Sequence, residues 1–324
     1  MQQSPVPAGG LETRAKLACA LAGVVWGLVW IPLRAMDQAG ISGAWATATL
    51  YVWPLLLLLP LAAWRWRRVL RGGVGLQVTG LVTGASLVLY ADALIYTEVI
   101  RAMMLFYLTP VWSTLLARIF LNEPITRARW FALALGFAGI LVIFGVETGF
   151  PWPRNLGDWM GLASGIVWAV AAVRMRGDNQ NHAIEFTTVQ FGWGALLAVG
   201  IAFLPLAGAG PAPGLERVAG ALPWLLPVVL LLVIPGTFAA LWGTPLLNPG
   251  IVGILFMTEI SVGSVTAALW AGEPFGTREI VGVLLISGAG LAESLQAPFA
   301  WRRARARARA GTGTGTGSAP RGRR

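Results

Sequence analysis

A carboxyl side chain, Glu259, stands near the middle of an apolar run over residues 250–270. An ionisable group at such a depth in a bilayer is costly when it is charged and unpaired. We therefore expect Glu259 to face a cavity or to carry a proton, which suits proton coupling or the binding of a cationic solute. The alternative is a structural carboxyl that bonds to a neighbouring helix.

A second charged group is formed by Asp92, near the end of the apolar run 75–97, and Arg101, at the start of the run 100–120. The short connection makes these two runs antiparallel neighbours, which places both side chains at a similar depth. We expect a salt bridge between them. Alternatively the pair faces the substrate, and Arg101 then binds a substrate carboxylate with two hydrogen bonds.

Aromatic side chains inside the apolar runs are candidates for the wall of a binding cavity. They are Trp26, Trp30, Tyr90, Tyr107, Trp168, Trp242 and Phe256. Of these, Trp26, Trp168 and Tyr90 lie deepest in their runs. Most of the other tryptophans fit the alternative of anchors at the membrane–water interface.

Two prolines within apolar runs predict breaks in helices. Pro110 removes one backbone hydrogen bond and frees the carbonyl of Phe106, and Pro235, followed by Gly236, frees the carbonyl of Leu231. Broken helices at the depth of the membrane centre are common at binding sites and hinges of transporters. We expect Pro110, Pro235 and Gly236 to act as hinges, although membrane helices also tolerate proline without a function.

The side chains needed for metal binding or covalent catalysis are scarce. The chain has one Cys (Cys19) and one His (His182), whereas the common zinc sites need several such ligands. It has no Gly-Lys-Ser/Thr loop that would hold nucleotide phosphates. We therefore expect no catalytic residue, no metal and no cofactor.

The elements that position these residues must lie in lipid. Hydrophobic residues make up 56% of the chain and charged residues only 12%, with a mean hydropathy of +0.69. A soluble domain carries about 25% charged residues. Such a chain cannot cover a soluble core with polar side chains, so we expect an all-α integral membrane protein.

Ten apolar runs are long enough to cross a bilayer as helices. They cover residues 16–33, 42–63, 75–97, 100–120, 128–146, 157–174, 185–205, 221–245, 250–270 and 277–297. Ten spans place both termini on one side. Most of the 24 basic residues then fall on the side of the Arg-rich C-terminal tail, and the positive-inside rule makes that side cytoplasmic.

The two halves of the chain resemble each other. The stretches that recur are Gly23-Val24-Val25-Trp26 with Gly165-Ile166-Val167-Trp168, Leu105-Phe106 with Leu255-Phe256, and Glu123-Pro124 with Glu273-Pro274. Each half holds five spans, an odd number, so the second half enters the membrane inverted. Such repeats place a substrate site between the halves near the bilayer midplane. We also expect Glu123 and Glu273 to cap the helices that follow them.

The chain resembles the EamA-type repeat of the drug/metabolite transporter superfamily. The resemblance is carried by Leu108-Thr109-Pro110-Val111, Leu121-Asn122-Glu123-Pro124-Ile125-Thr126, Gly136, Gly139, and the second copy Ala271-Gly272-Glu273-Pro274-Phe275 with Gly282, Gly288 and Gly290. One departure is that Glu259-Ile260 replaces the proline that the family often repeats. The resemblance implies a ten-helix transporter that moves small organic solutes by alternating access.

The expected organisation follows from these observations. Residues 1–15 form a cytoplasmic segment, 16–147 the first EamA-like five-helix repeat, 148–156 a periplasmic linker, 157–297 the second repeat, and 298–324 a disordered Arg-rich tail. We expect the tail to lie against anionic lipid headgroups rather than nucleic acid. Small-residue spacings in the helices allow close packing within the chain or in a homodimer.

The expected function is a secondary transporter of amino acids, metabolites or drugs, and by family analogy an exporter. Its expected location is the inner membrane of a bacterium, with both termini cytoplasmic. The candidate substrate-binding or coupling residues are Glu259, Asp92, Arg101, Tyr90, Trp26, Trp168 and Phe256. Two alternatives remain open: a membrane-embedded enzyme, and a receptor or scaffold that transports nothing.

Overall fold

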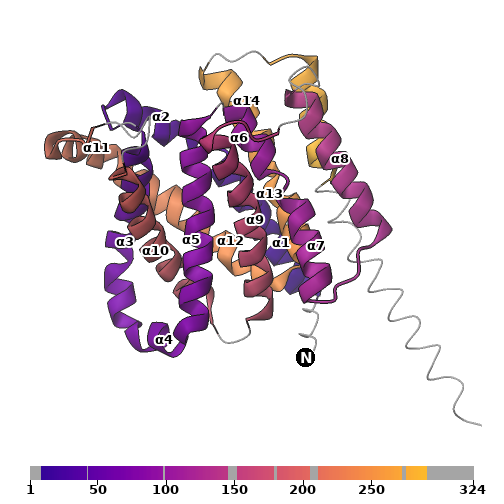
Figure 1. Cartoon of the computed structure of the whole chain (residues 1–324), viewed down its shortest axis with the longest axis horizontal. Helices are drawn as coiled ribbons and strands as arrows, with labels where there is room; N and C mark the ends of the chain where they lie inside the picture. Colours follow the sequence, from indigo (N-terminus) through magenta and orange to yellow (C-terminus); the bar gives the residue numbers. More distant parts are fainter. Residues whose placement is uncertain are drawn as a thin grey trace, which may run out of the picture.

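The computed structural model describes residues 9–41, 43–97, 99–144, 152–178, 181–204, 211–271 and 275–289. All regular secondary structure in these ranges is helical (Figure 1). The predicted linker 148–156, the N-terminal segment 1–15 and the second Glu-Pro turn, Glu273-Pro274, lie partly or wholly outside them. The predicted tail 298–324 lies wholly outside the described residues.

The helices follow one another along the chain with short connections. They are α1 (Gly9–Trp26), α2 (Trp30–Gln38), α3 (Ala44–Trp64), α4 (Trp66–Arg71), α5 (Gly73–Tyr96), α6 (Val99–Phe106), α7 (Thr109–Phe120), α8 (Arg127–Phe144), α9 (Leu156–Gly177), α10 (Ala183–Ala202), α11 (Leu215–Val228), the π-helical η2 (Val229–Val233), α12 (Ile234–Gly243), the 3-10 turn η3 (Thr244–Leu246), α13 (Pro249–Phe256) and α14 (Thr258–Ala271). Residues 277–289 are also helical.

The protein is a multi-pass membrane protein. Within the described residues, eight helical segments are long and apolar enough to cross a bilayer. They correspond to the predicted runs one to four and six to nine. The other two predicted runs, 128–146 and 277–297, extend past described residues, and their described parts are helical in α8 and over 277–289. Ten spans therefore remain a prediction.

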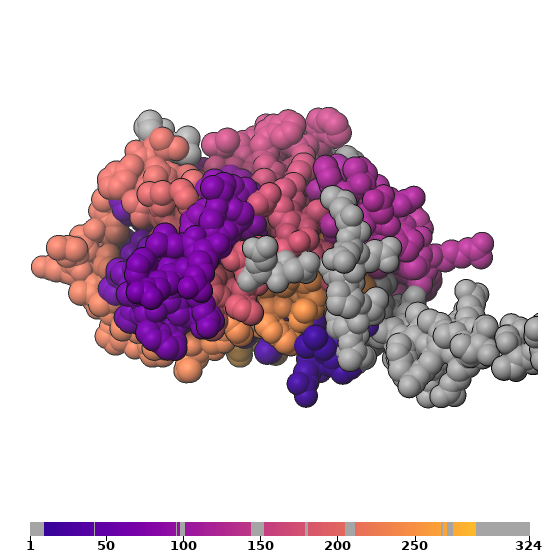
Figure 2. All heavy atoms as spheres, turned by 90° about the horizontal axis from the view of Figure 1, so that it is seen from below, coloured from indigo at the N-terminus to yellow at the C-terminus, as the bar shows by residue number. Residues whose placement is uncertain are grey.

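One end of the helix bundle carries the arginine-rich helix α4. Figure 1 places α4 and the start of α1 at the same end, with α6, α11 and α14 towards the opposite end. Figure 2 shows the purple surface of the α4 region and the indigo start of α1 on one face of the molecule. The predicted cytoplasmic basic residues of α4 and the described N-terminal residues thus lie at one end.

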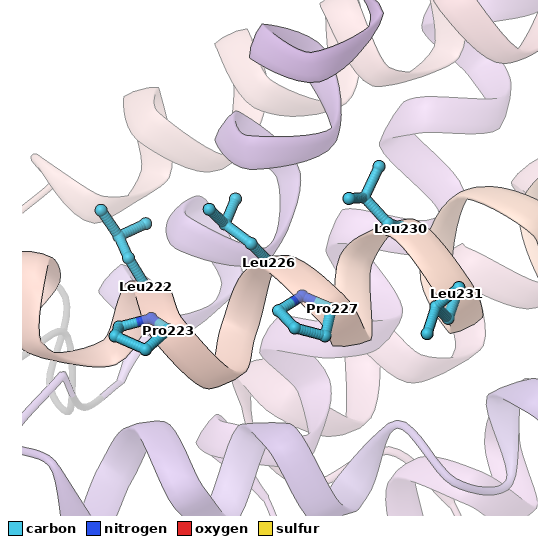
Figure 3. A pocket seen from close by; sticks show the side chains of 6 residues that line it. All are labelled: Leu222, Pro223, Leu226, Pro227, Leu230 and Leu231. Carbon is cyan, nitrogen blue, oxygen red and sulfur yellow. The ribbon is translucent and has the colours of Figure 1, made fainter.

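The outer surface of the bundle is apolar. A shallow groove on α11 and η2 shows this well, since leucine and proline side chains from consecutive turns line it (Figure 3). The residues are Leu222, Pro223, Leu226, Pro227, Leu230 and Leu231. Leu231 is exposed, as a lipid-facing side chain is in a membrane protein.

Two helices are interrupted at corresponding places in the two halves. The first breaks at Tyr107 and Leu108, between α6 and α7, just before Pro110. The second breaks at Met257, between α13 and α14, although no proline follows it. A hydroxyl binds a carbonyl beside each break: Thr109 donates to Phe106 O at 2.5 Å and Thr258 donates to Leu255 O at 2.9 Å. The break therefore recurs without the repeated proline.

Glycines of the first helix in each half lie against these breaks. A Cβ atom on Gly165 of α9 would stand 2.7 Å from the Phe106 carbonyl oxygen, and one on Gly23 of α1 would stand 3.1 Å from the Phe256 carbonyl oxygen. Gly23 and Gly165 occupy equivalent places in the recurring Gly-x-Val-Trp stretch. Each half thus places its first helix against the broken helix of the other.

Candidate functional site

The centre of the site is a hydrogen bond between a tyrosine and a buried carboxyl. Tyr90 of α5 donates its hydroxyl to Oε1 of Glu259 at 3.1 Å. Glu259 is 5% exposed and stands in the first turn of α14, directly after the break at Met257. The buried Tyr107 hydroxyl, in the other break, is near enough to interact with this carboxyl, but it has no hydrogen-bond partner of normal geometry in the described residues. Both breaks therefore supply residues to the same site.

Six of the seven predicted aromatic residues pack into one apolar core, which also holds Met257 and Ile260, close to Glu259 in the chain. The seventh, Trp30, donates its indole N–H to the Thr266 hydroxyl instead. The ring of Trp26 lies 5.8 Å from Trp168 and 4.8 Å from Phe256, and Trp168 lies 5.5 Å from Phe256. Tyr90 stacks on Phe106 at 4.2 Å, and Phe106 contacts Tyr107 at 5.2 Å. We call Trp26, Tyr90, Phe106, Tyr107, Trp168 and Phe256 the aromatic cluster. Their side chains come from α1, α5, α6, α9, α13 and, for Tyr107, the break between α6 and α7.

The cluster offers three kinds of interaction to a solute. The Glu259 carboxyl can bind a proton or a cation, and the ring faces can stack on a flat group or attract a cation. The indole N–H of Trp168, which is 1% exposed, has no hydrogen-bond acceptor in the described part of the chain. The rings pack against one another, so the predicted cavity wall is a closed cluster in this conformation.

The predicted salt bridge between Asp92 and Arg101 is wrong. Arg101 instead binds Asp158 of α9, with a distance of 2.5 Å from its terminal nitrogen to Oδ2, and it also donates to the Trp152 carbonyl. Asp158 further accepts from the Thr97 hydroxyl and the Arg154 backbone N–H. The Arg101 donors are therefore held in an ion pair rather than directed at the aromatic cluster.

Asp92 lies apart from this ion pair, among residues of α3. The polar group that interacts with it is the Thr47 hydroxyl, and its charge also acts on Tyr51 of α3. Asp92 is fully buried. Although Asp92 and Arg101 are close in sequence, their side chains face different neighbours because α5 turns this carboxyl towards α3.

Glu123 does not cap the helix that follows it, contrary to the sequence prediction. It binds Arg176 at the end of α9 at 3.2 Å, and Arg176 also donates to the Pro245 carbonyl. The hydroxyl of Thr126 instead accepts from the backbone N–H of Arg129 in the first turn of α8. Thr126 precedes the helix directly, as a capping residue must. The second predicted cap, Glu273, lies outside the described residues.

The predicted hinge positions coincide with irregular helix geometry. Pro110 follows the break between α6 and α7, and Pro235 follows the π-helical segment η2, as expected when a backbone hydrogen bond is lost. Gly236 lies against α1, since a Cβ atom there would meet the Val25 side chain at 2.5 Å. Hinge motion at these places stays a prediction.

Several important residues were not identified from the sequence. Asp158 and Glu185 are buried carboxylates in ion pairs, the latter with Arg65 at 2.6 Å. For Asp158 a signal existed, because Asn155 three residues earlier caps α9 by accepting from the Asp158 N–H. Phe106 could have been identified from its position in the recurring Leu-Phe pair.

In the described residues, no group of three or more His, Cys, Asp or Glu side chains can hold a metal ion.

Comparison with known proteins confirms the predicted family resemblance. Residues 13–145 match the EamA-like transporter family. The chain is 29% identical over 130 residues to an uncharacterized transporter of Vibrio cholerae, covering 37% of this chain and 43% of that protein. It is 29% identical over 170 residues to a riboflavin transporter of Rhizobium johnstonii, covering 47% and 51%. The matched region thus spans about half the length of these curated relatives.

A solved structure shares the fold. One crystal structure of a protein superimposes with a TM-score of 0.66 and 18% sequence identity, covering 88% of this chain and 97% of the other. At this identity the likeness concerns the arrangement of the helices alone. It agrees with the all-helical architecture described above.

Proposed function

Because residues 13–145 carry an EamA-like transporter repeat, we propose that this chain is a secondary transporter of small organic solutes that binds its solute at Glu259 and the aromatic cluster. The observation that carries the proposal is the bond from Tyr90, a member of the aromatic cluster, to Glu259, a buried carboxyl directly after a helix break. Intramembrane carboxyls are expensive and mark solute or proton pathways in transporters. The relatives are named as transporters, which favours this function over an enzyme.

The architecture that we propose is ten helices in two inverted five-helix repeats, 16–147 and 157–297. Two relations support it: the helix breaks recur in both halves, and Gly23 and Gly165 pack reciprocally against them. The proposed site lies between the two breaks, since Tyr107 stands in one of them and Glu259 directly after the other. This is the place at which inverted repeats hold their substrates.

The mechanism that we propose is alternating access through movement at the α13–α14 break. On one side, α9 is attached near both its ends by ion pairs, Asp158 to Arg101 and Arg176 to Glu123. On the other side, α1 meets α14 through Gly27 and through a hydrogen bond from Thr258 to the Ala20 carbonyl. In the described residues, the interface of α1 with α14 has no ion pair, unlike that of α9. The α1–α14 interface therefore separates more readily, and its opening exposes Glu259.

The chemistry of the cluster favours a solute with a flat ring or a positive charge, within the broader class of amino acids, metabolites and drugs. Rings such as Trp26 and Phe256 stack on planar groups, and Glu259 neutralises a cation. The riboflavin transporter among the relatives is named for a solute with a flat ring system, which makes riboflavin a sensible member of a test panel.

We propose export across a bacterial inner membrane with both termini cytoplasmic. The arginine-rich α4 lies at the same end of the bundle as the start of α1 (Figures 1 and 2), and basic residues favour the cytoplasmic side. The tail after residue 297 would lie against anionic headgroups on that side. Pro110 and the Pro235-Gly236 pair would absorb the helix movements.

The test is transport by the purified protein in proteoliposomes. A panel of labelled amino acids, organic cations and riboflavin is loaded inside, and efflux is measured with and without a pH gradient. The proposal expects saturable efflux of at least one class, lost in Glu259→Gln and kept in Glu216→Gln, a carboxyl exposed at the start of α11. Equal efflux from empty liposomes and from liposomes with protein, for every solute, would contradict a transporter and favour a receptor or scaffold.

A further inference from the structure

The second buried carboxyl, Asp92, lacks the partners that buried charges need. The residue is 0% exposed, and neither carboxylate oxygen has a hydrogen-bond partner in the described part of the chain. The Thr47 hydroxyl on α3 is near enough to interact with this carboxyl, yet it too lacks a hydrogen-bond partner of normal geometry. Asp92 is thus a buried acidic group that faces a weak polar neighbour.

Among the described residues, no positive charge compensates that of an ionised Asp92. The titratable groups that interact with Asp92 are Tyr51 of α3 and Tyr96 of its own helix, and both are acids. Helices α6 and α9 also pack against α5. Their charged residues Arg101 and Asp158 are bound to each other. From α10, Ala195 and Ala198 pack in one apolar core with Val88 of α5 and Tyr51 of α3, and the buried polar side chain Gln190 is an uncharged amide.

Asp158 provides a direct comparison, because it is also an aspartate with 0% exposure. It has an arginine, a hydroxyl and a backbone N–H as donors, which is how proteins keep a buried carboxylate charged. In the described residues, Asp92 has neither the arginine nor the backbone N–H, and its one hydroxyl neighbour, Thr47, makes no hydrogen bond of normal geometry. An ionised carboxylate buried without such donors is strongly unfavourable, and the group binds a proton instead.

We propose that Asp92 and Thr47 form a second proton-binding site, separate from Glu259, in which the Asp92 carboxylate takes one proton and becomes a neutral acid in this conformation. Loss of that proton leaves a charge between α3 and α5, so it requires the two helices to separate or water to enter. The occupancy of the site therefore sets how tightly α3 packs against α5.

Helix α5 connects this site to the aromatic cluster. Tyr90 stands two residues before Asp92, and residues two apart point to roughly opposite sides of a helix. One side of α5 therefore presents Tyr90 to Glu259, while the other presents Asp92 to α3. A shift of α5 on loss of the Asp92 proton changes the Tyr90–Glu259 contact. The chain thus has two carboxyl sites joined by one helix.

The first test compares thermal unfolding of two matched variants of the full chain in detergent. Asn resembles a protonated aspartate in shape and charge, so Asp92→Asn is expected to melt at or above the wild-type temperature, with the difference growing as pH rises. Asp158→Asn removes a charge from an ion pair and is expected to melt lower. A loss of melting temperature in Asp92→Asn as large as that in Asp158→Asn overturns the proposal.

The second test detects the proton directly and needs no solute. Dicyclohexylcarbodiimide enters apolar regions and adds to protonated carboxyls, and rearrangement leaves a stable N-acylurea that contains the whole reagent. Mass spectrometry of the digested protein is expected to find the adduct at Asp92 but not at Asp158, with labelling that falls as pH rises. Thr47→Val removes the polar neighbour, so its labelling is expected to persist to higher pH. Absence of the Asp92 adduct at every pH overturns the proposal, whatever the result of the transport assay.

Discussion

The hydroxyl of Tyr90 and the carboxyl of Glu259, 169 positions apart in the chain, are joined by a hydrogen bond of 3.1 Å. The bond links α5 to the first turn of α14, directly after a helix break. Because this donor is a neutral hydroxyl, the carboxyl can exchange it for a solute or take up a proton. The relation therefore connects the helix movement proposed for transport with the chemistry of the site.

Glu259→Gln is expected to reduce the transport rate by at least about tenfold, since a hydrogen bond to a charged group contributes roughly 1.5–3 kcal/mol. It is also expected to remove the dependence of transport on pH, because an amide binds no proton. Efflux from proteoliposomes at several pH values measures both effects. Transport that keeps its pH profile in this variant would make Glu259 a structural residue.

Tyr90→Phe is expected to have a smaller effect, because the ring stays and only the neutral donor is lost, which contributes about 1 kcal/mol. Stacking on Phe106 is retained in this variant. The apparent affinity for solute and the pH profile are measured in the same assay. A rate loss as large as that of Glu259→Gln would mean that the hydroxyl takes part in proton transfer rather than in holding the carboxyl.

The sequence named Glu259 and most of the aromatic residues that pack near it, but not the contacts between them. Glu259 stands out because a charge inside an apolar run is rare, and Trp26, Trp168 and Phe256 because they recur or lie deep in their runs. The contact of Tyr90 with Glu259 depends on how the two halves pack, which short motifs do not encode. The packing also explains why these residues form a closed cluster instead of lining a cavity.

The ion pair between Arg101 and Asp158 is expected to stabilise the fold. Removing one partner leaves an uncompensated charge in a largely buried place, which costs roughly 3–5 kcal/mol. Arg101→Gln and Asp158→Asn are each expected to lower the melting temperature, and the double variant is expected to lose much less than the sum. The same cycle with Arg101→Gln and Asp92→Asn is expected to be additive. Coupling of Arg101 to Asp92 instead would contradict the observed pairing.

The wrong prediction for Arg101 has a simple physical cause. Sequence proximity offered Asp92, because the connection between α5 and α6 is short. Arg101 pairs with the carboxylate that has other donors around it. That carboxylate is Asp158 at the start of α9, which also accepts from the Arg154 backbone N–H and the Thr97 hydroxyl. The break at Met257 was unforeseen for a related reason, since the local sequence lacks the proline that marks the break before Pro110.

Substitution of Gly165 by alanine is expected to destabilise the protein by about 1–3 kcal/mol, as overpacked cores do. The added Cβ atom would stand 2.7 Å from the Phe106 carbonyl oxygen, which is backbone and cannot rotate away. Gly23→Ala is expected to be destabilising as well, because the added Cβ atom would overlap the Thr258 hydroxyl, which bonds to the Ala20 and Leu255 carbonyls. Thermal unfolding in detergent ranks the variants.

Gly192→Ala is the matched control for the glycine variants. Gly192 lies inside α10, and a Cβ atom there would meet nothing within 4 Å. Alanine in an unobstructed helical position is expected to stabilise by about 0.5–1 kcal/mol. If Gly165→Ala and Gly192→Ala changed the melting temperature alike, the close approach of α9 to the α6–α7 break would be refuted.

The proposed orientation predicts which ends of the bundle are accessible from each side of the membrane. Cys19 is the only cysteine in the sequence and is buried, so Cys19→Ala gives a cysteine-free background. A cysteine in place of Arg68 in α4 is expected to react with a membrane-impermeant maleimide only in inside-out vesicles. A cysteine in place of Glu216 at the start of α11, towards the opposite end of the bundle (Figure 1), is expected to react only in intact cells or spheroplasts. Reaction of both from the same side would contradict the assignment of α4 and α11 to opposite faces, and an exchange of the two results would place α4 and the start of α1 outside the cell.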